Sequence, residues 1–382
     1  MFTMSKEERL KIIEEIEKKR QAPLICYATS DRPNFPFPIS MDATRLFNDH
    51  LNATSKGKKC DKLDLFLYSR GGDTRVPWII VRTFRESCNE FNVLIPFRAH
   101  SAATMIALGA DNIIMGKEGE LSPIDPTIRT PYCPRDPADN KKVLPVNVAD
   151  LTGYVTLIKE KVGITNQQEL GTALKTLAKD MHPLALGGIN RHLSFIRLVA
   201  QRLLSSHNKK LEEAKVDRIV DDLVEKTFFH EHTIGRREAK NLNLKIKHAE
   251  DYAIEDLMWS LFEHYEELMK LREPLVPEDI LDSHNVEEYV ESGLAGAIIE
   301  SKFRTDVCKA DMRMKRIRQV PQNINLNLNL QVPQGLQLQP AQIQALRRVV
   351  QQQVQQILQT QLMQAPIIGY EARRIRVRWE QI

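Results

Sequence analysis

Short apolar segments alternate with helical patterns in the first part of the chain, and no other feature restricts the fold as strongly. The apolar segments are rich in strand-forming residues and occupy residues 23–29, 63–69, 93–99 and 112–116. The patterns between them have the spacing of amphipathic helices and occupy residues 42–52, 76–87 and 101–108. Strands that alternate with helices form parallel βαβ units. The sequence therefore predicts an α/β domain.

Helical patterns also precede and follow this part. Ser5 and Glu8 form a capping box before apolar residues at helical spacing, which predicts a charged helix to about residue 20. Residues 146–271 are mostly helical in pattern and predict a helical subdomain. We expect breaks in it near Pro183, Gly187, Gly188 and residues 230–235. The predicted regions are an N-terminal helix at 1–20, a folded domain at 21–305, and a tail at 306–382.

The composition of the tail differs from that of the preceding residues. Residues 309–319 carry five basic side chains and one acid, and residues 320–340 alternate polar and apolar residues with three prolines. We expect a solvated basic linker and a largely flexible, Gln-rich tail, because such a segment cannot build a core alone. Apolar residues at helical spacing predict one amphipathic helix at 342–363, whose stripe is typical of a self-association surface.

Composition also excludes several classes of protein. Hydrophobic residues make up 42% and charged residues 27%, which argues against a fully disordered chain. No apolar stretch reaches the roughly 18 residues of a membrane span, and residues 1–20 lack the apolar core of a signal peptide. The five cysteines are scattered without a CxxC pair, and no HExxH motif is present. We expect a cytoplasmic protein without metal or other cofactor. Nucleic acid is an unexpected partner, because the net charge of +4 is too small to argue for it.

A pair of glycines follows the second predicted strand directly. Gly71 and Gly72 precede a predicted helix, so their backbone N–H groups can approach a bound group without an intervening Cβ. A phosphate is one candidate, but the spacing matches neither the P-loop nor the GxGxxG motif. The other candidate is the oxyanion of a tetrahedral acyl intermediate, which needs two N–H donors.

Ser101 follows the third predicted strand and opens a helix of small residues. A serine at this place is either a helix N-cap or a nucleophile at the carboxyl edge of the sheet. The upstream glycine pair, and the small residues Ala102 and Ala103 at the helix start, favour the nucleophile.

Three separated blocks now point to a family. The segments RGGD, HSAATMIALGADNIIMG and ELSPIDP resemble those of the serine dehydrogenase proteinase family. These are ClpP-like serine peptidases of the Clp/crotonase superfamily, related to signal peptide peptidase A. The resemblance extends over about residues 20–250, and Asn112 stands where that family usually has Glu. It implies a ClpP/crotonase-like spiral core, a homo-oligomer, and hydrolysis of peptide substrates through an acyl-enzyme on Ser101. Gly72 and Ala102 are then the expected oxyanion donors.

The resemblance also implies a triad in the order Ser, Asp, His. The family's Pro-hydrophobic-Asp-Pro block places the acid at Asp125, and counting back four residues from Ile234 places the histidine at His230. His182, in a His-Pro segment, and His232 are the alternative bases.

Other readings of the sequence stay open. A Ser–Lys dyad, as in signal peptide peptidases, would use Lys159 or Lys161, or else Lys141 or Lys142, and a lysine base must be buried to lose its proton. The rival to any enzyme is a non-catalytic Clp-fold scaffold with a vestigial serine site. Crotonase-type acyl-CoA chemistry is disfavoured, because it needs no serine at the helix start.

Overall fold

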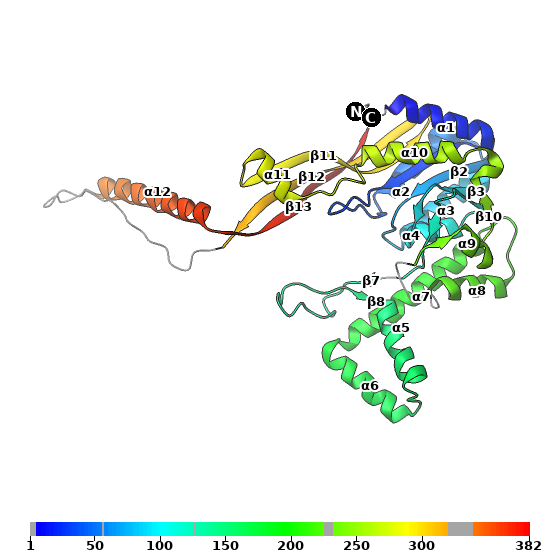
Figure 1. Cartoon of the computed structure of the whole chain (residues 1–382), viewed down its shortest axis with the longest axis horizontal. Helices are drawn as coiled ribbons and strands as arrows, with labels where there is room; N and C mark the ends of the chain where they lie inside the picture. The colour runs from blue at the N-terminus through cyan, green and yellow to red at the C-terminus, as the bar shows by residue number, and fades with distance from the viewer. Residues whose placement is uncertain (1–4, 56, 126, 225–231, 320–338) are drawn as a thin grey trace. The chain divides into compact units, whose positions relative to one another are not determined.

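A computed structural model describes residues 5–55, 57–125, 127–224, 232–319 and 339–382 (Figure 1). Its contacts divide the chain into two compact units. The first unit contains Met1–Pro274, Ala295–Lys309 and Trp379–Ile382, and the second contains Leu275–Leu294 and Ala310–Arg378. In the described residues, no helix combines the length and the apolar character needed to cross a membrane.

The central sheet has eight strands in the order β10-β5-β3-β2-β1-β11-β12-β13. Neighbouring strands from β10 to β1 pair in parallel, which confirms the prediction of βαβ units, and β11 pairs with β1 antiparallel. Their bounds are β1 (Leu24–Thr29), β2 (Cys60–Tyr68), β3 (Cys88–Ile95), β5 (Asn112–Met115), β10 (Ile246–His248), β11 (Glu288–Ser301), β12 (Arg304–Arg318) and β13 (Ile367–Gln381).

Helices cover both faces of the parallel strands in the first unit (Figure 1). Along β1, Ile25 and Tyr27 pack into one apolar cluster while Leu24 and Cys26 pack into the other, because successive strand residues point to opposite faces. The first cluster is closed by α2 (Ala43–Ser55), α3 (Val76–Ser87), α4 (Ala102–Leu108), α7 (Pro183–Ser205) and α8 (Glu213–Val224). The second is closed by α1 (Lys6–Arg20) and α10 (Glu255–Leu268), and the Ser5–Glu8 capping box is present at α1 as predicted.

The break predicted near Pro183 is confirmed, because α6 ends before Met181 and α7 begins at Pro183. Pro183 explains this break, because a proline at the first helical position lacks only an N–H that would have no intrahelical partner. The break predicted at Gly187 and Gly188 is wrong, since α7 runs through both residues. The other elements here are β4 (Arg98–Ala99), β6 (Glu120–Leu121), β7 (Thr127–Ile128), β8 (Val146–Asn147), α5 (Val148–Thr156), a π-helix (Leu157–Lys161), α6 (Gln167–Asp180), β9 (Ile234–Gly235), α9 (Arg236–Asn241) and a 3₁₀ helix (Ala249–Tyr252).

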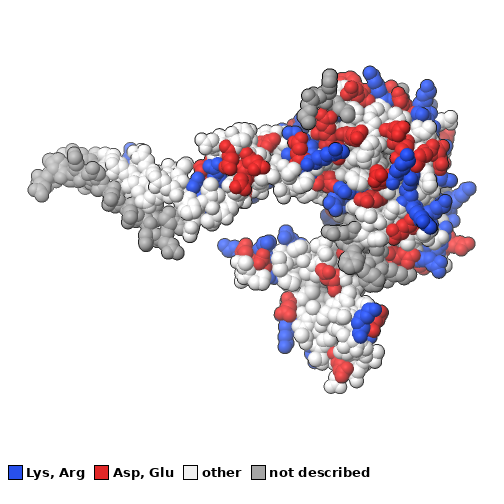
Figure 2. All heavy atoms as spheres, in the orientation of Figure 1, with Lys and Arg blue, Asp and Glu red and all other residues white. Residues whose placement is uncertain are grey.

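The second unit corrects the prediction of a flexible tail. Residues 339–382 contain α12 (Pro340–Gln364), which confirms the predicted amphipathic helix, and β13, whose last residues belong to the first unit. The basic run predicted as a linker is the strand β12, and its arginines pair with acids, as Arg316 and Arg318 do with Glu287. The unit also contains α11 (Pro277–His284). Few charged side chains are visible in the region of α12 (Figure 2), whose charged residues are Arg347 and Arg348.

Candidate active site

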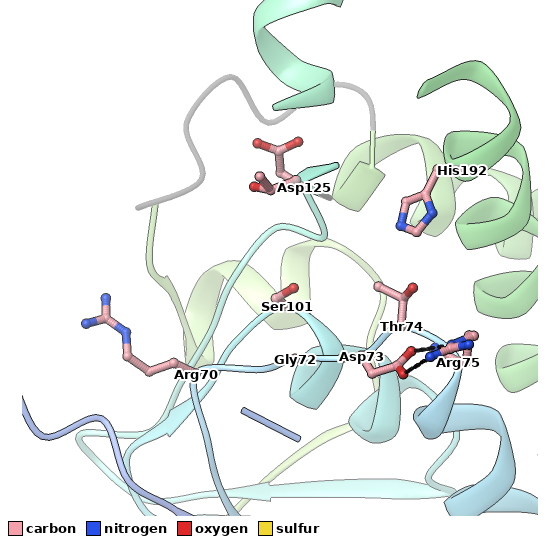
Figure 3. Close-up of a pocket in the computed structure, with 9 residues that line it drawn as sticks. Arg70, Gly72, Asp73, Thr74, Arg75, Ser101, Asp125 and His192 are labelled. Carbon is pink, nitrogen blue, oxygen red and sulfur yellow. Dashed lines mark hydrogen bonds and ion pairs between the residues drawn. The ribbon is translucent and has the colours of Figure 1, made fainter. Parts of the chain in front are cut away.

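A pocket of about 480 Å³ in the first unit brings together three of the predicted site residues. Gly72, Ser101 and Asp125 line it, and a histidine of α7 lines it as well (Figure 3). The full lining is Arg70, Gly72, Asp73, Thr74, Arg75, Ser101, Asp125, Thr127 and His192.

Ser101 has a strained backbone. Its φ is 51° and its ψ is −113°, at the junction between β4 and α4. The residue occupies the N-cap position of α4, but its hydroxyl forms no capping hydrogen bond with the helix. The backbone N–H of Ser101 donates to Ser122 Oγ at 2.8 Å. The side chain of Ser101 faces the pocket (Figure 3). The capping interpretation therefore does not explain this serine, and strain of this kind at a pocket is typical of functional positions.

The glycine pair fits tightly beside Ser101. A Cβ on Gly71 would lie 2.8 Å from Ser101 Cβ and 3.0 Å from the backbone N of Ala102, so no larger residue fits at position 71. Gly72 has a φ of 153°, and its neighbours form the backbone bridge to Ile39. That bridge uses the carbonyl of Gly71 and the N–H of Asp73 and leaves out the N–H of Gly72. Gly72 is exposed and lines the same pocket as Ser101.

Two hydroxyl groups tie the start of α4 to the segment that carries Asp125. Thr104 Oγ1 donates to the carbonyls of Ala99 and Ser122, at 2.7 and 3.0 Å, and it accepts the N–H of Ser122 at 3.1 Å. Both Thr104 and Ser122 are buried. Neither residue was predicted from the sequence, although a threonine within an otherwise apolar helix indicates a buried hydrogen bond. Together they set the position of Ser101.

Asp125 is buried and contributes to helix α5. One carboxylate oxygen accepts the N–H of Ala149 at 3.2 Å, in the first turn of that helix. Figure 3 shows the carboxylate turned away from Ser101. An anion at a helix N-terminus interacts favourably with the helix dipole. Asp125 therefore has a visible structural task in addition to the catalytic role predicted for it.

His192 was not predicted as a base, and among the described residues it is the histidine that lines the pocket. It is half-buried on α7, and burial lowers the pKa of its imidazole, while the carboxylate of Asp73 acts in the opposite direction. Asp73 forms an ion pair with Arg75 at 2.6 Å, and its hydrogen bonds to Arg75 lower the pKa of Asp73. The pocket thus combines a hydroxyl, an imidazole whose pKa is lowered by burial and a carboxylate whose pKa is lowered by its hydrogen bonds to Arg75.

Comparison with known proteins finds a family for the first part of the chain. Residues 1–181 match the family model of ClpP-like SDH-type serine proteinases. This part of the chain belongs to that family. The matched region contains Gly72, Ser101 and Asp125, whereas His192 lies beyond it.

Two uncharacterized proteins of Methanocaldococcus jannaschii are similar in sequence to this chain. The first is 26% identical over 189 residues, which are 44% of this chain and 65% of the relative. The second is 29% identical over 127 residues, which are 31% of this chain and 42% of the relative. The chain thus covers less than two thirds of the length of either relative.

The two described histidines that were considered as bases, His182 and His232, do not line the pocket. His230 lies outside the described residues. His182 is exposed and caps α7, where its Nδ1 accepts the N–H of Leu184 at 3.1 Å. His232 is exposed and pairs with Glu238 at 2.8 Å.

The lysines of the alternative dyad are exposed. Lys159 and Lys161 lie on the π-helix, and Lys142 pairs with Asp136 at 3.0 Å. Lys141 is exposed too, and none of these four lines the pocket. A lysine base depends on burial, and all four of these lysines are exposed. Within the described ranges, no group of three His, Cys, Asp or Glu side chains could hold a metal ion.

Proposed function

We propose that this chain is a serine peptidase that hydrolyses peptide bonds through an acyl-enzyme on Ser101. The main support for this proposal is the position of the Ser101 hydroxyl. It lies at a strained turn and faces a pocket instead of capping its helix. A strained turn that presents a serine between a strand and a helix is the usual way in which α/β hydrolases expose their nucleophile. The family of residues 1–181 supports a proteinase, and Ser101 lies within that region.

The proposed reaction has two steps. Ser101 Oγ attacks the carbonyl carbon of the scissile bond while a base takes the hydroxyl proton, and the tetrahedral intermediate then expels the amine, which receives that proton. A water molecule, deprotonated by the same base, attacks the resulting ester and releases the carboxylic acid and free Ser101. The N–H groups of Gly72 and Ala102 are the proposed donors to the oxyanion in both steps.

Two histidines compete for the role of base. The resemblance implies His230, with Asp125 as the acid that orients it. The pocket favours His192, because this imidazole lies with Ser101 in one cavity and its burial favours the neutral form that accepts a proton. Asp73 is then the carboxylate suited to stabilise the imidazolium.

Four broader expectations belong to the same proposal. We propose that the mixed α/β domain has the ClpP/crotonase-like spiral arrangement and that the chain forms a homo-oligomer. We also propose a cytoplasmic location and a substrate made of peptide or unfolded protein. The fold-level part rests on the family of residues 1–181.

One serine variant and its matched control test the nucleophile. A fluorophosphonate probe should label the wild-type protein once, at Ser101, and Ser101→Ala should remove both labelling and casein hydrolysis. Ser5→Ala is the matched control, because Ser5 caps α1 with its side chain. That control should lose about 1 kcal/mol of unfolding free energy and keep its labelling. A wild-type protein that neither labels nor hydrolyses casein would favour the non-catalytic scaffold.

A further inference from the structure

An arginine that the proposed reaction does not use lines the pocket with Ser101. Arg70 is exposed and directly precedes the glycine pair. It lies on the side of Ser101 opposite His192 (Figure 3). A peptide that extends from His192 across Ser101 therefore comes close to Arg70 within the same pocket.

The backbone on both sides of Arg70 is fixed by hydrogen bonds. Ser69 is buried, and its N–H and carbonyl each bond the chain segment of β4 at 2.9 Å. On the other side, the N–H of Gly71 donates to Ser69 Oγ at 3.0 Å, and the carbonyl of Gly71 accepts the N–H of Ile39 at 2.8 Å. Arg70 therefore projects from a firmly held point of the chain, although its side chain is exposed.

The guanidinium of Arg70 has no partner among the described residues, since it forms no hydrogen bond or ion pair with any of them. The other arginine of the pocket differs, because Arg75 forms an ion pair with Asp73 at 2.6 Å. The buried carboxylate of Asp125 accepts the N–H of Ala149. All five N–H donors of the Arg70 guanidinium are thus available to a ligand in the pocket.

The chemistry of a guanidinium selects the ligand. It stays protonated at every pH at which a protein is folded, and its planar fork of N–H donors matches the two oxygens of a carboxylate. In an unmodified peptide at neutral pH, the anionic groups are the side chains of Asp and Glu and the C-terminal carboxylate. The side chains of Lys and Arg would be repelled at the same place, because like charges repel one another.

We propose that Arg70 determines substrate specificity by binding a carboxylate of the peptide close to the scissile bond. The carboxylate is supplied by an acidic side chain or by a nearby free C-terminus. This inference rests on the proposed peptidase function, since it names the substrate preference of the same site.

Two sets of paired synthetic peptides test the preference and identify the source of the carboxylate. In the first set, peptides blocked at both ends carry Glu or Gln at one position, which is moved stepwise along the chain. In the second set, peptides without acidic side chains end in a free carboxylate or in an amide. We expect the wild-type protein to cleave the anionic member of at least one set with a kcat/KM about 3-fold to 10-fold higher. Equal kcat/KM values in every pair would overturn the role of Arg70.

Substitutions of Arg70 link the preference to this residue. Arg70→Gln removes the charge and should bring the ratio of kcat/KM between anionic and neutral peptides close to 1. Arg70→Lys keeps the charge without the fork and should retain part of the ratio, whereas Arg70→Glu should invert it in favour of peptides with Lys. Arg82→Gln is the matched control, because Arg82 is an exposed arginine of α3 that does not line the pocket. A wild-type ratio in Arg70→Gln would contradict the proposal.

The dependence on salt provides a readout that a change of shape would not give. An ion pair at an exposed side chain is screened by added salt, so the wild-type ratio should fall between about 50 mM and about 500 mM NaCl. The ratio in Arg70→Gln should not respond to salt. A wild-type preference that is independent of salt would contradict recognition by charge.

The two proposals fail in different ways. A wild-type protein without fluorophosphonate labelling or hydrolysis contradicts the peptidase itself. A labelled, active protein that cleaves anionic and neutral peptides equally contradicts the role of Arg70 alone.

Discussion

The hydroxyl oxygen of Ser122 accepts the backbone N–H of Ser101 at 2.8 Å, and this bond holds the strained residue in place. Ser122 is buried, and its own backbone N–H and carbonyl are bonded to Thr104 of α4. The conformation of Ser101 is thus maintained by a neighbour three residues before Asp125. The two segments that carry the predicted nucleophile and acid are fixed to one another through hydroxyl groups.

Replacing Ser122 tests this support. We expect Ser122→Ala to lower the unfolding free energy by about 1–3 kcal/mol, because the N–H of Ser101 loses its buried acceptor. Fluorophosphonate labelling should slow by more than the lost folded fraction explains, and Ser122→Thr should restore part of the rate. Ser194→Ala, at an exposed position on α7, is the control. Full-rate labelling of folded Ser122→Ala would show that the bond does not position Ser101.

Parallel histidine variants identify the base. We expect His192→Ala to lower kcat by several orders of magnitude, because a nucleophile and its base act as a unit. His182→Ala, which removes an exposed helix cap, should retain its kcat and lose at most about 1–2 kcal/mol of stability. A fully active His192→Ala enzyme together with an inactive His230→Ala enzyme would return the role to His230.

The pH profile provides a second criterion for the base. Burial lowers the pKa of His192, and a general base must be unprotonated. The rate constant kcat/KM should therefore rise through an apparent pKa below the ordinary value of about 6.5 and remain high above it. A rise that begins well above pH 8 would indicate a lysine instead.

An isosteric substitution of Asp125 distinguishes its two proposed roles. Asp125→Asn keeps an oxygen acceptor for the N–H of Ala149 but removes the charge. If Asp125 stabilises an imidazolium, kcat should fall by on the order of 10⁴-fold while the melting temperature changes little. Asp125→Ala should lower stability as well. An active Asp125→Asn enzyme would reduce Asp125 to a helix cap and favour Asp73 as the acid.

Stability should also depend on a buried histidine far from the pocket. His50 bonds Ser301 at 2.9 Å and Asp306 at 3.0 Å, and burial lowers the pKa of His50 despite the carboxylate. Below about pH 6.5 the unfolded chain binds a proton that folded His50 does not, so the unfolding free energy should fall as the pH decreases. Denaturant titrations between pH 5 and 7 measure the slope, and His50→Gln should reduce it. An unchanged slope would contradict this assignment.

Sequence patterns predicted the strands and helices between residues 23 and 116 because each element there has a clear periodicity. The same patterns identified Ser101 and the glycine pair, whose residue types follow from local backbone needs. They did not identify His192, because its place at the pocket depends on how α7 packs against α4, a contact between distant parts of the chain. Arg316 and Arg318 were assigned to a linker because their acidic partner, Glu287, lies about thirty residues upstream.

The apolar stripe of α12 allows a test of assembly. No described residue of this helix is fully buried, and Leu346, Val350 and Ile357 are half-buried. We expect the homo-oligomer to persist in light scattering when these three residues are replaced by Gln. Truncation is a poorer test, because the last residues of β13 belong to the first unit, where Trp379 donates to Asp42. A monomeric triple variant would show that α12 builds the oligomer.

Because α7 is one unbroken helix, an insertion or deletion within it would displace the residues that follow. Gly188, Arg191, His192 and Phe195 share one face, and inserting or deleting a single residue before Gly188 would rotate all four by about 100° around the helix axis. Such a change would remove the imidazole of His192 from the pocket that contains Ser101. Length variation among relatives should therefore fall in the loops on either side of α7.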